Sequence, residues 1–184
     1  MKVLSEKDLN PIAYHLAKVE WAIFGTGTWM NDSATAYSEA AEQIRQQDYH
    51  RLIWHTCRHL NLRPRNLAIY RKTEWGGGMR GHYNFLLARH GTKDTPPQLL
   101  AATVQDYWSK RHGLAKIEPF DAKRQWQGVA YQSKFEFDAN GNRLEPYEYK
   151  SDALKALFWK NADADSNFKL PPMLNRILAD NFTA

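Results

Sequence analysis

Apolar residues recur along this chain with two different periods, and each period predicts a different element. Spacing of three and four residues predicts helices, and alternating or continuous short apolar runs predict strands. The helical pattern slips near Asp48, so the run 37–60 forms either one kinked helix or two. Predicted helices cover 1–18, 37–60, 96–113, 122–135 and 153–160, and predicted strands cover 19–29, 67–74, 82–89, 115–119, 135–137 and 143–149.

Turn signals predict how these strands pair. The glycine-rich run 75–81 joins strand 67–74 to strand 82–89, which predicts an antiparallel hairpin. Asn140-Gly141 predicts a second hairpin turn. Hairpins interspersed with helices predict an α+β fold, a central antiparallel β-sheet flanked by helices, and residues 1–184 suit a single domain.

Composition narrows the class of protein. No apolar run approaches the roughly 20 residues of a membrane span, and residues 1–7 lack the apolar core of a secretory signal. The one cysteine, Cys57, excludes an internal disulfide and fits a reducing compartment. We therefore expect a cytoplasmic protein that is not in contact with a membrane.

Positive charge is concentrated in one part of the chain. The net charge is +5, and residues 61–94 hold seven Arg or Lys against two Asp or Glu, an excess as large as that of the whole chain. This favours a polyanionic partner, although a solvated basic face explains such a run equally well. Aromatic residues make up 13% of the chain, and beside basic residues they suit single-stranded nucleic acid, whose bases stack on rings.

A metal site is predicted on the strand 82–89. Alternation places His82 and Asn84 on one face, separated by about 7 Å of backbone. Glu74 ends the preceding strand and approaches both across the hairpin. A carboxylate, an imidazole and an amide oxygen form a hard, incomplete ligand set that suits Mg²⁺ or Mn²⁺ with positions left for water and phosphate.

A candidate nucleophile lies about fifty residues further along the chain. Tyr131 and Lys134 stand three residues apart in a predicted helix and share a face. A phenol becomes an effective nucleophile when positive charge stabilises its phenolate, and Lys134 and the metal would supply that charge. Each residue alone is commonplace, but together they predict metal-assisted phosphoryl transfer to tyrosine.

A second candidate metal site involves His55 and His59. Two histidines at i and i+4 of a helix can bind a metal. The pair lacks the glutamate of a zinc hydrolase motif and a further ligand cluster, so a zinc site here is the weaker alternative.

In this order, these residues resemble the HUH endonuclease superfamily, specifically its single-tyrosine rolling-circle replication initiator (Rep) proteins. That family has three motifs. Trp21–Trp29 resembles its apolar strand motif, and Arg80-Gly81-His82-Tyr83-Asn84 resembles its His-hydrophobic-His motif. Tyr131-Gln132-Ser133-Lys134 resembles its Tyr-x-x-Lys motif. Glu74 stands where the family's acidic ligand is often found. The main departure is Asn84, where the family has a second histidine.

The resemblance implies a nuclease core over 19–136 with the ferredoxin-like or RRM-like sheet of Rep proteins, followed by a C-terminal hairpin and helical extension over 137–184. It implies nicking and joining of single-stranded DNA at an origin hairpin or loop, with Tyr131 joined to the 5′ phosphate, during replication of a plasmid or phage. No nucleotide-binding P-loop motif is present, so unwinding would fall to a host helicase. Expected DNA contacts are Arg71, Lys72 and Arg80 on the backbone and Trp75 and Trp126 as stacking platforms.

Two alternatives remain at this point. A mobile-element transposase of the same superfamily would use the same residues. A non-catalytic relative would bind nucleic acid on the same sheet, and Asn84 in place of histidine favours that reading.

Overall fold

The computed structural model describes residues 12–29, 39–74, 82–89, 94–120, 129, 132–133, 136–137, 143–144 and 148–162. At several element ends, including Glu74 and His82, it describes the backbone only. The helices are α1 Ile12–Ala17, α2 Glu39–His59, α3 Pro97–Arg111 and α5 Asp152–Ala162, with a 3₁₀ turn η2 at Pro64–Asn66. The strands are β1 Trp21–Thr28, β2 Leu67–Glu74, β3 His82–Arg89, β4 Ala115–Pro119, β5 Glu136–Phe137, β6 Arg143–Leu144 and β7 Glu148–Lys150.

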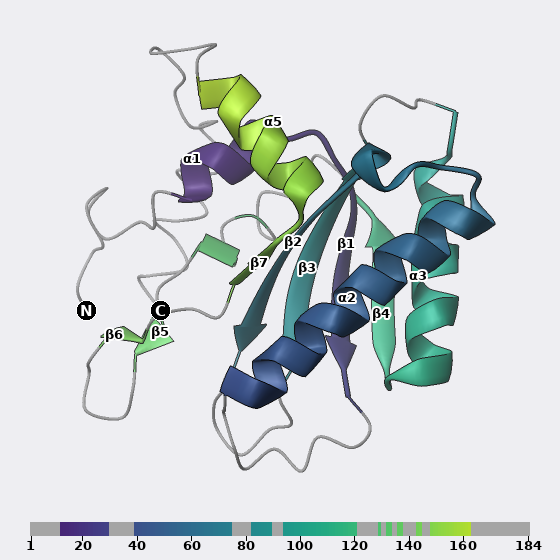
Figure 1. Cartoon of the computed structure of the whole chain (residues 1–184), viewed down its shortest axis with the longest axis horizontal. Helices are drawn as coiled ribbons and strands as arrows, with labels where there is room; N and C mark the ends of the chain where they lie inside the picture. Colours follow the sequence, from purple (N-terminus) through teal and green to yellow (C-terminus); the bar gives the residue numbers. More distant parts are fainter. Residues whose placement is uncertain are drawn as a thin grey trace.

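A five-stranded sheet with the order β4-β1-β3-β2-β7 forms the centre of the molecule (Figure 1). Every neighbouring pair in it is antiparallel. This confirms the predicted α+β class and the predicted hairpin between β2 and β3. The strand that carries His82 and Asn84 is central, so it is supported by a partner on each side.

Alternation along the strands divides the core into two layers. Ile69, Phe85 and Leu87 project to one face and pack against apolar residues of α2 and α3. Tyr70 and Leu86 project to the other face, where α1 and α5 lie. Figure 1 shows α2 and α3 on one side of the sheet and α1 and α5 on the other. Period-two patterning of the strands therefore produces a sandwich with a helical layer on each face.

Two glycines let aromatic residues approach β1 closely. A Cβ added at Gly25 would lie 2.5 Å from Ile117 Cδ1 and 2.6 Å from Phe85 Cζ, and one at Gly27 would lie 2.9 Å from Trp108 Nε1. Phe85 and Trp108 are fully buried. The missing side chains on this face of β1 thus leave the space that the rings of β3 and α3 occupy.

The helix α2 excludes one of the two predicted forms, a pair of separate helices. Its 21 residues run from Glu39 to His59 without a break at Asp48. Asp48 is buried, yet Trp29 Nε1 donates to its Oδ2 at 3.3 Å and Arg51 donates to its Oδ1 at 3.1 Å. Because its carboxylate is satisfied, the polar residue that broke the apolar phase fits into a continuous helix.

The C-terminal strands differ in part from the prediction. The expected hairpin forms between Glu136–Phe137 and Arg143–Leu144. Glu148–Lys150, which was expected to continue that hairpin, instead pairs with β2 and becomes an edge strand of the main sheet. The helix predicted over 153–160 is confirmed as α5.

The helix α3 matches its predicted bounds closely. Leu100, Thr103, Val104 and Trp108 are buried against the sheet side of the core, whereas Leu99 is 48% exposed. No helix in the described part of the chain is long and apolar enough to cross a membrane.

Candidate functional site

The register of the central strands assembles the candidate site. In the β2–β3 ladder Glu74 is the partner of His82, and Lys72 is the partner of Asn84. In the β1–β3 ladder Thr28 is the partner of His82 and Thr26 that of Asn84. Directly paired residues share a face, with Cβ atoms about 5 Å apart. The predicted approach of Glu74 to His82 across the hairpin is therefore confirmed at the level of the backbone.

Asn84 is held in place by a neighbour that the sequence did not reveal. It is buried, and Thr26 Oγ1 donates a hydrogen bond of 2.7 Å to its Oδ1. An amide oxygen has two lone pairs, so one remains for a second partner. Thr26 lies 58 residues away on β1, and no motif marks it in the sequence.

Three residues of this face could hold a divalent cation by the chemistry of their side chains. Glu74, His82 and Asn84 alternate onto one sheet face of two paired strands, and their side chains supply one carboxylate, one imidazole and one amide oxygen. Among residues whose side chains the structure describes, no three His, Cys, Asp or Glu gather in one group. The side chains of Glu74 and His82 lie outside that set.

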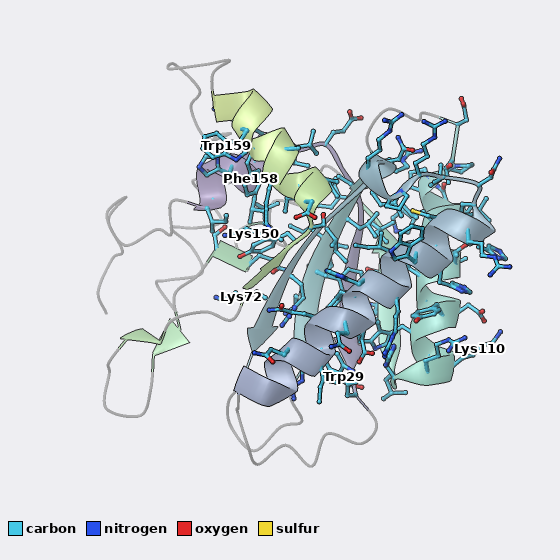
Figure 2. All side chains as sticks on the ribbon, viewed as in Figure 1. Trp29, Lys72, Lys110, Lys150, Phe158 and Trp159 are labelled. Carbon is cyan, nitrogen blue, oxygen red and sulfur yellow. The ribbon has the colours of Figure 1, made fainter. Side chains whose placement is uncertain are left out.

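The Lys72 side chain is on the same sheet face as Asn84, but it is not at the protein surface. It is 1% exposed and projects from β2 on the side away from α2 (Figure 2). Burial contradicts the expectation that Lys72 contacts a DNA backbone from the protein surface. The structure makes it an interior lysine, placed opposite Asn84 in the ladder.

Arg71 is a second correction. It lies on the opposite face of β2 and is 0% exposed. Its guanidinium carbon stands 4.9 Å from the centroid of the Tyr49 ring on α2. A cation stacked on a buried ring contributes to the core, and its position behind the sheet excludes contact with a strand bound at Asn84.

The segment that carries the candidate nucleophile packs on the face of Asn84. Val129 is fully buried in the cluster that contains Tyr70 and Leu86. Val129, Gln132 and Ser133 are helical, and Ser133 Oγ donates to the Val129 carbonyl oxygen at 2.7 Å. The helix predicted there is confirmed at these positions. Predicted site residues that lie outside the described part of the chain are Tyr131, Lys134, Trp75, Arg80 and Trp126.

Gln132 has a property that sequence reasoning missed. It is 1% exposed, and neither Oε1 nor Nε2 has a hydrogen-bond partner among the described residues. A buried amide without partners costs about 1–3 kcal/mol. Native proteins keep few such groups, so this amide, next to Tyr131 in sequence, is a polar group whose role can be tested.

The alternative zinc site gains no further ligand. The rings of His55 and His59 are stacked with centroids 6.0 Å apart, and His55 also lies 4.5 Å from the Tyr107 ring. Cys57, between them in sequence, is buried, and burial raises the pKa of its thiol to about 11. A buried neutral thiol is a poor ligand, and no described acidic or histidine side chain completes a group of three.

Comparison with known proteins does not assign this chain to a family. No protein-family model, no curated protein and no solved structure matches this chain. The chemistry of the site is therefore inferred from its own residues and from the way the sheet arranges them.

Proposed function

We propose that this protein nicks and rejoins single-stranded DNA in a metal-dependent reaction, with Tyr131 as the nucleophile. The observation that supports this most is the strand register. It pairs Glu74 with His82, two positions from Asn84, on the face against which Val129 packs. The backbone positions of the proposed metal ligands and the side chain of Val129, two residues before Tyr131 in sequence, thus lie on one side of the sheet.

Each residue of the site has a separate role in the proposed reaction. Glu74, His82 and Asn84 would hold Mg²⁺ or Mn²⁺, which polarises a non-bridging phosphate oxygen when bound. The Tyr131 oxygen attacks phosphorus, the bond from phosphorus to the 3′ oxygen breaks, and the phenolic proton ends on the released 3′ hydroxyl. Lys134 stabilises the negative charge on the phenolate and the phosphate. The product is a 5′ phosphotyrosine, whose bond energy allows the same site to rejoin strands.

The biological setting follows from that product. A free 3′ hydroxyl at a nick primes synthesis, so the protein is proposed to initiate rolling-circle replication of a plasmid or phage. The same cut and rejoining would serve a mobile-element transposase. Strand separation would come from a host helicase.

The second candidate is a non-catalytic protein that binds nucleic acid on the same face. The observation that favours it is the 2.7 Å hydrogen bond from Thr26 to Asn84. It gives Asn84 a structural role that needs no metal. This candidate predicts binding that does not depend on Mn²⁺ or on the Tyr131 hydroxyl.

A covalent-adduct assay separates the two. The protein is incubated with a pool of single-stranded oligonucleotides and Mn²⁺, and the products are resolved on a denaturing gel. We expect a shifted protein band with the wild type and none with Tyr131→Phe or with a chelator. Tyr107→Phe is the matched control because Tyr107 is a buried tyrosine of α3 on the other side of the sheet.

Mapping the modified peptide identifies the tyrosine that carries the nucleotide. An adduct on a different tyrosine would overturn the role of Tyr131 and keep the reaction class. Retained binding with no adduct in any pool would overturn nicking and favour the non-catalytic protein.

A further inference from the structure

Trp54 forms an exposed aromatic ridge on the outer side of α2. Its side chain is 65% exposed, although it is one of the largest apolar groups in the chain. Two hollows, of about 360 Å³ and about 510 Å³, adjoin it. Trp54 and Pro64 line both hollows. The indole is therefore part of the wall of two recesses, each large enough to take a planar ring.

The first hollow is apolar at its base and polar at its rim. Ile53 and Leu67, both buried, form part of its lining, and Ala153 and Ala156 of α5 face them. His50, Arg65 and Asp152 supply its polar groups. Apolar surface for a ring and convergent polar groups for its edge are the usual composition of a ligand site.

The charge around Trp54 is positive. Arg58 lines the second hollow and Arg65 the first, and both are exposed. Neither forms an ion pair or hydrogen bond with any described residue. The carboxylate of Asp152 is 3.1 Å from Lys155 Nζ, which offsets its charge. Two guanidinium groups that no described side chain pairs, beside an exposed indole, suit an anionic, aromatic ligand.

This surface lies at the other end of β2 from the candidate catalytic site. α2 covers the face that carries Ile69 and Phe85, and the first hollow is also lined by residues of α5, which lies on the face of Asn84. Leu67, which lines that hollow, begins β2, and Glu74 ends it. The two places are thus separated by a strand length of about 23 Å (roughly 3.3 Å per residue).

We infer that the Trp54 ridge is a second binding site for single-stranded DNA. Bases enter the two hollows and stack on the indole, and Arg58 and Arg65 contact the phosphates on either side. Stacking on a ring is tolerant of sequence because every base has an aromatic face. The choice of single-stranded DNA rests on the proposed function, in which the substrate strand extends beyond the nick and can reach a second surface.

The test measures binding without chemistry. All proteins carry Tyr131→Phe, and fluorescence anisotropy follows a labelled oligo(dT) of about 16 nucleotides. We expect Trp54→Ala to raise Kd by at least about 5-fold and Trp54→Phe to restore most of the affinity. Trp159→Ala is the matched control, because Trp159 is 78% exposed on α5 and lies away from α2 (Figure 2).

The arginines are tested through salt dependence. Each neutralised phosphate contributes about −0.7 to the slope of log K against log salt for single strands. We expect Arg58→Gln with Arg65→Gln to make that slope less negative by about 1.4. Equal affinity of Trp54→Ala and Trp159→Ala would overturn the inference, as would an unchanged slope, which would mean that Arg58 and Arg65 contact no phosphate.

The two proposals fail in different ways. Binding that depends on Trp54, with no covalent adduct from the protein that retains Tyr131, would keep the ridge and overturn nicking. An adduct mapped to Tyr131, together with binding that does not depend on Trp54, would keep nicking and overturn the second binding site.

Discussion

The hydroxyl of Thr26 on β1 donates a 2.7 Å hydrogen bond to Oδ1 of Asn84 on the neighbouring strand β3. The bond fixes which end of the amide faces Thr26, so it fixes where the remaining lone pair of Oδ1 points. A group that orients a ligand in this way typically affects metal affinity by 10- to 100-fold when removed.

Thr26→Val removes the donor while keeping the shape of the side chain. We expect Mn²⁺ affinity to fall by about tenfold and the free energy of unfolding to fall by about 1 kcal/mol, because a buried amide loses its partner. Isothermal titration with Mn²⁺ and urea denaturation measure the two effects. Thr26→Ser keeps the hydroxyl and is expected to retain both properties. Wild-type Mn²⁺ affinity in the valine variant would contradict an orienting role.

Asn84→Asp replaces the amide oxygen by a carboxylate of nearly the same size. Carboxylates are stronger ligands for hard cations, and Thr26 can still donate to the new group. We expect Mn²⁺ to bind about tenfold more tightly, a difference of about 1.4 kcal/mol. Asn84→Leu is the control, expected to lose Mn²⁺ binding and to keep the secondary structure seen by circular dichroism. Undiminished Mn²⁺ binding in the leucine variant would remove Asn84 from the ligand set.

Gln132→Met replaces an amide that has no described partner by an apolar side chain of similar length. Burying such an amide costs free energy in the folded protein, so we expect the variant to be more stable by about 1 kcal/mol in urea denaturation. We also expect a lower yield of covalent adduct, because a polar group adjacent to Tyr131 in sequence is lost. A destabilised variant would mean that the amide is satisfied in the native protein. A more stable variant with a full yield of adduct would leave Gln132 without a role in the reaction.

His112 makes stability depend on pH. Burial lowers its pKa below the ordinary 6.5, although Asp48 raises it and Arg111 and Arg51 lower it further. Since the unfolded chain takes up this proton at a higher pH than the folded chain does, the free energy of unfolding decreases as pH falls from above 6.5 through the folded pKa. Urea denaturation at several pH values across that window measures the loss. We expect His112→Gln to lose less stability than the wild type over the same range.

Any dependence of stability on pH that remains in His112→Gln has two further sources in this structure. Burial also lowers the pKa of His15 and of His55, so both contribute with the same sign. If the wild type and His112→Gln have parallel pH profiles, the burial of His112 does not control acid sensitivity.

Sequence patterns predicted the strands that carry the site, and they did so for local reasons. β2, β3 and β4 have the predicted bounds, because short apolar runs bounded by glycine or proline are strong local signals. The pairing of Glu74 with His82 followed from the hairpin alone. A hairpin joins residues that are close in sequence, so its register depends on few other contacts.

Features that depend on distant contacts were not predictable in this way. Asp48 interrupts the apolar pattern of α2, but its carboxylate accepts a hydrogen bond from Trp29, which directly follows β1. Arg71 looked like a surface cation, but it stacks on Tyr49 in the core. The sequence did not identify Thr26 as a partner of Asn84, because nothing within 21–28 or 82–89 encodes the β1–β3 register. In each case a tertiary contact reversed the preference of the residue type.

The edge position of β7 has a consequence for how the protein is made. Ile69 N–H donates to Ser151 Oγ at 3.0 Å, and Ser151 N–H donates to the Ile69 carbonyl oxygen at 3.1 Å, across 82 residues of chain. Until that part of the nascent chain has been translated, β2 is an unpaired edge that can recruit strands from other molecules. Chains that stop before Glu148 are therefore expected to aggregate, even though they already contain every residue of the proposed nicking site.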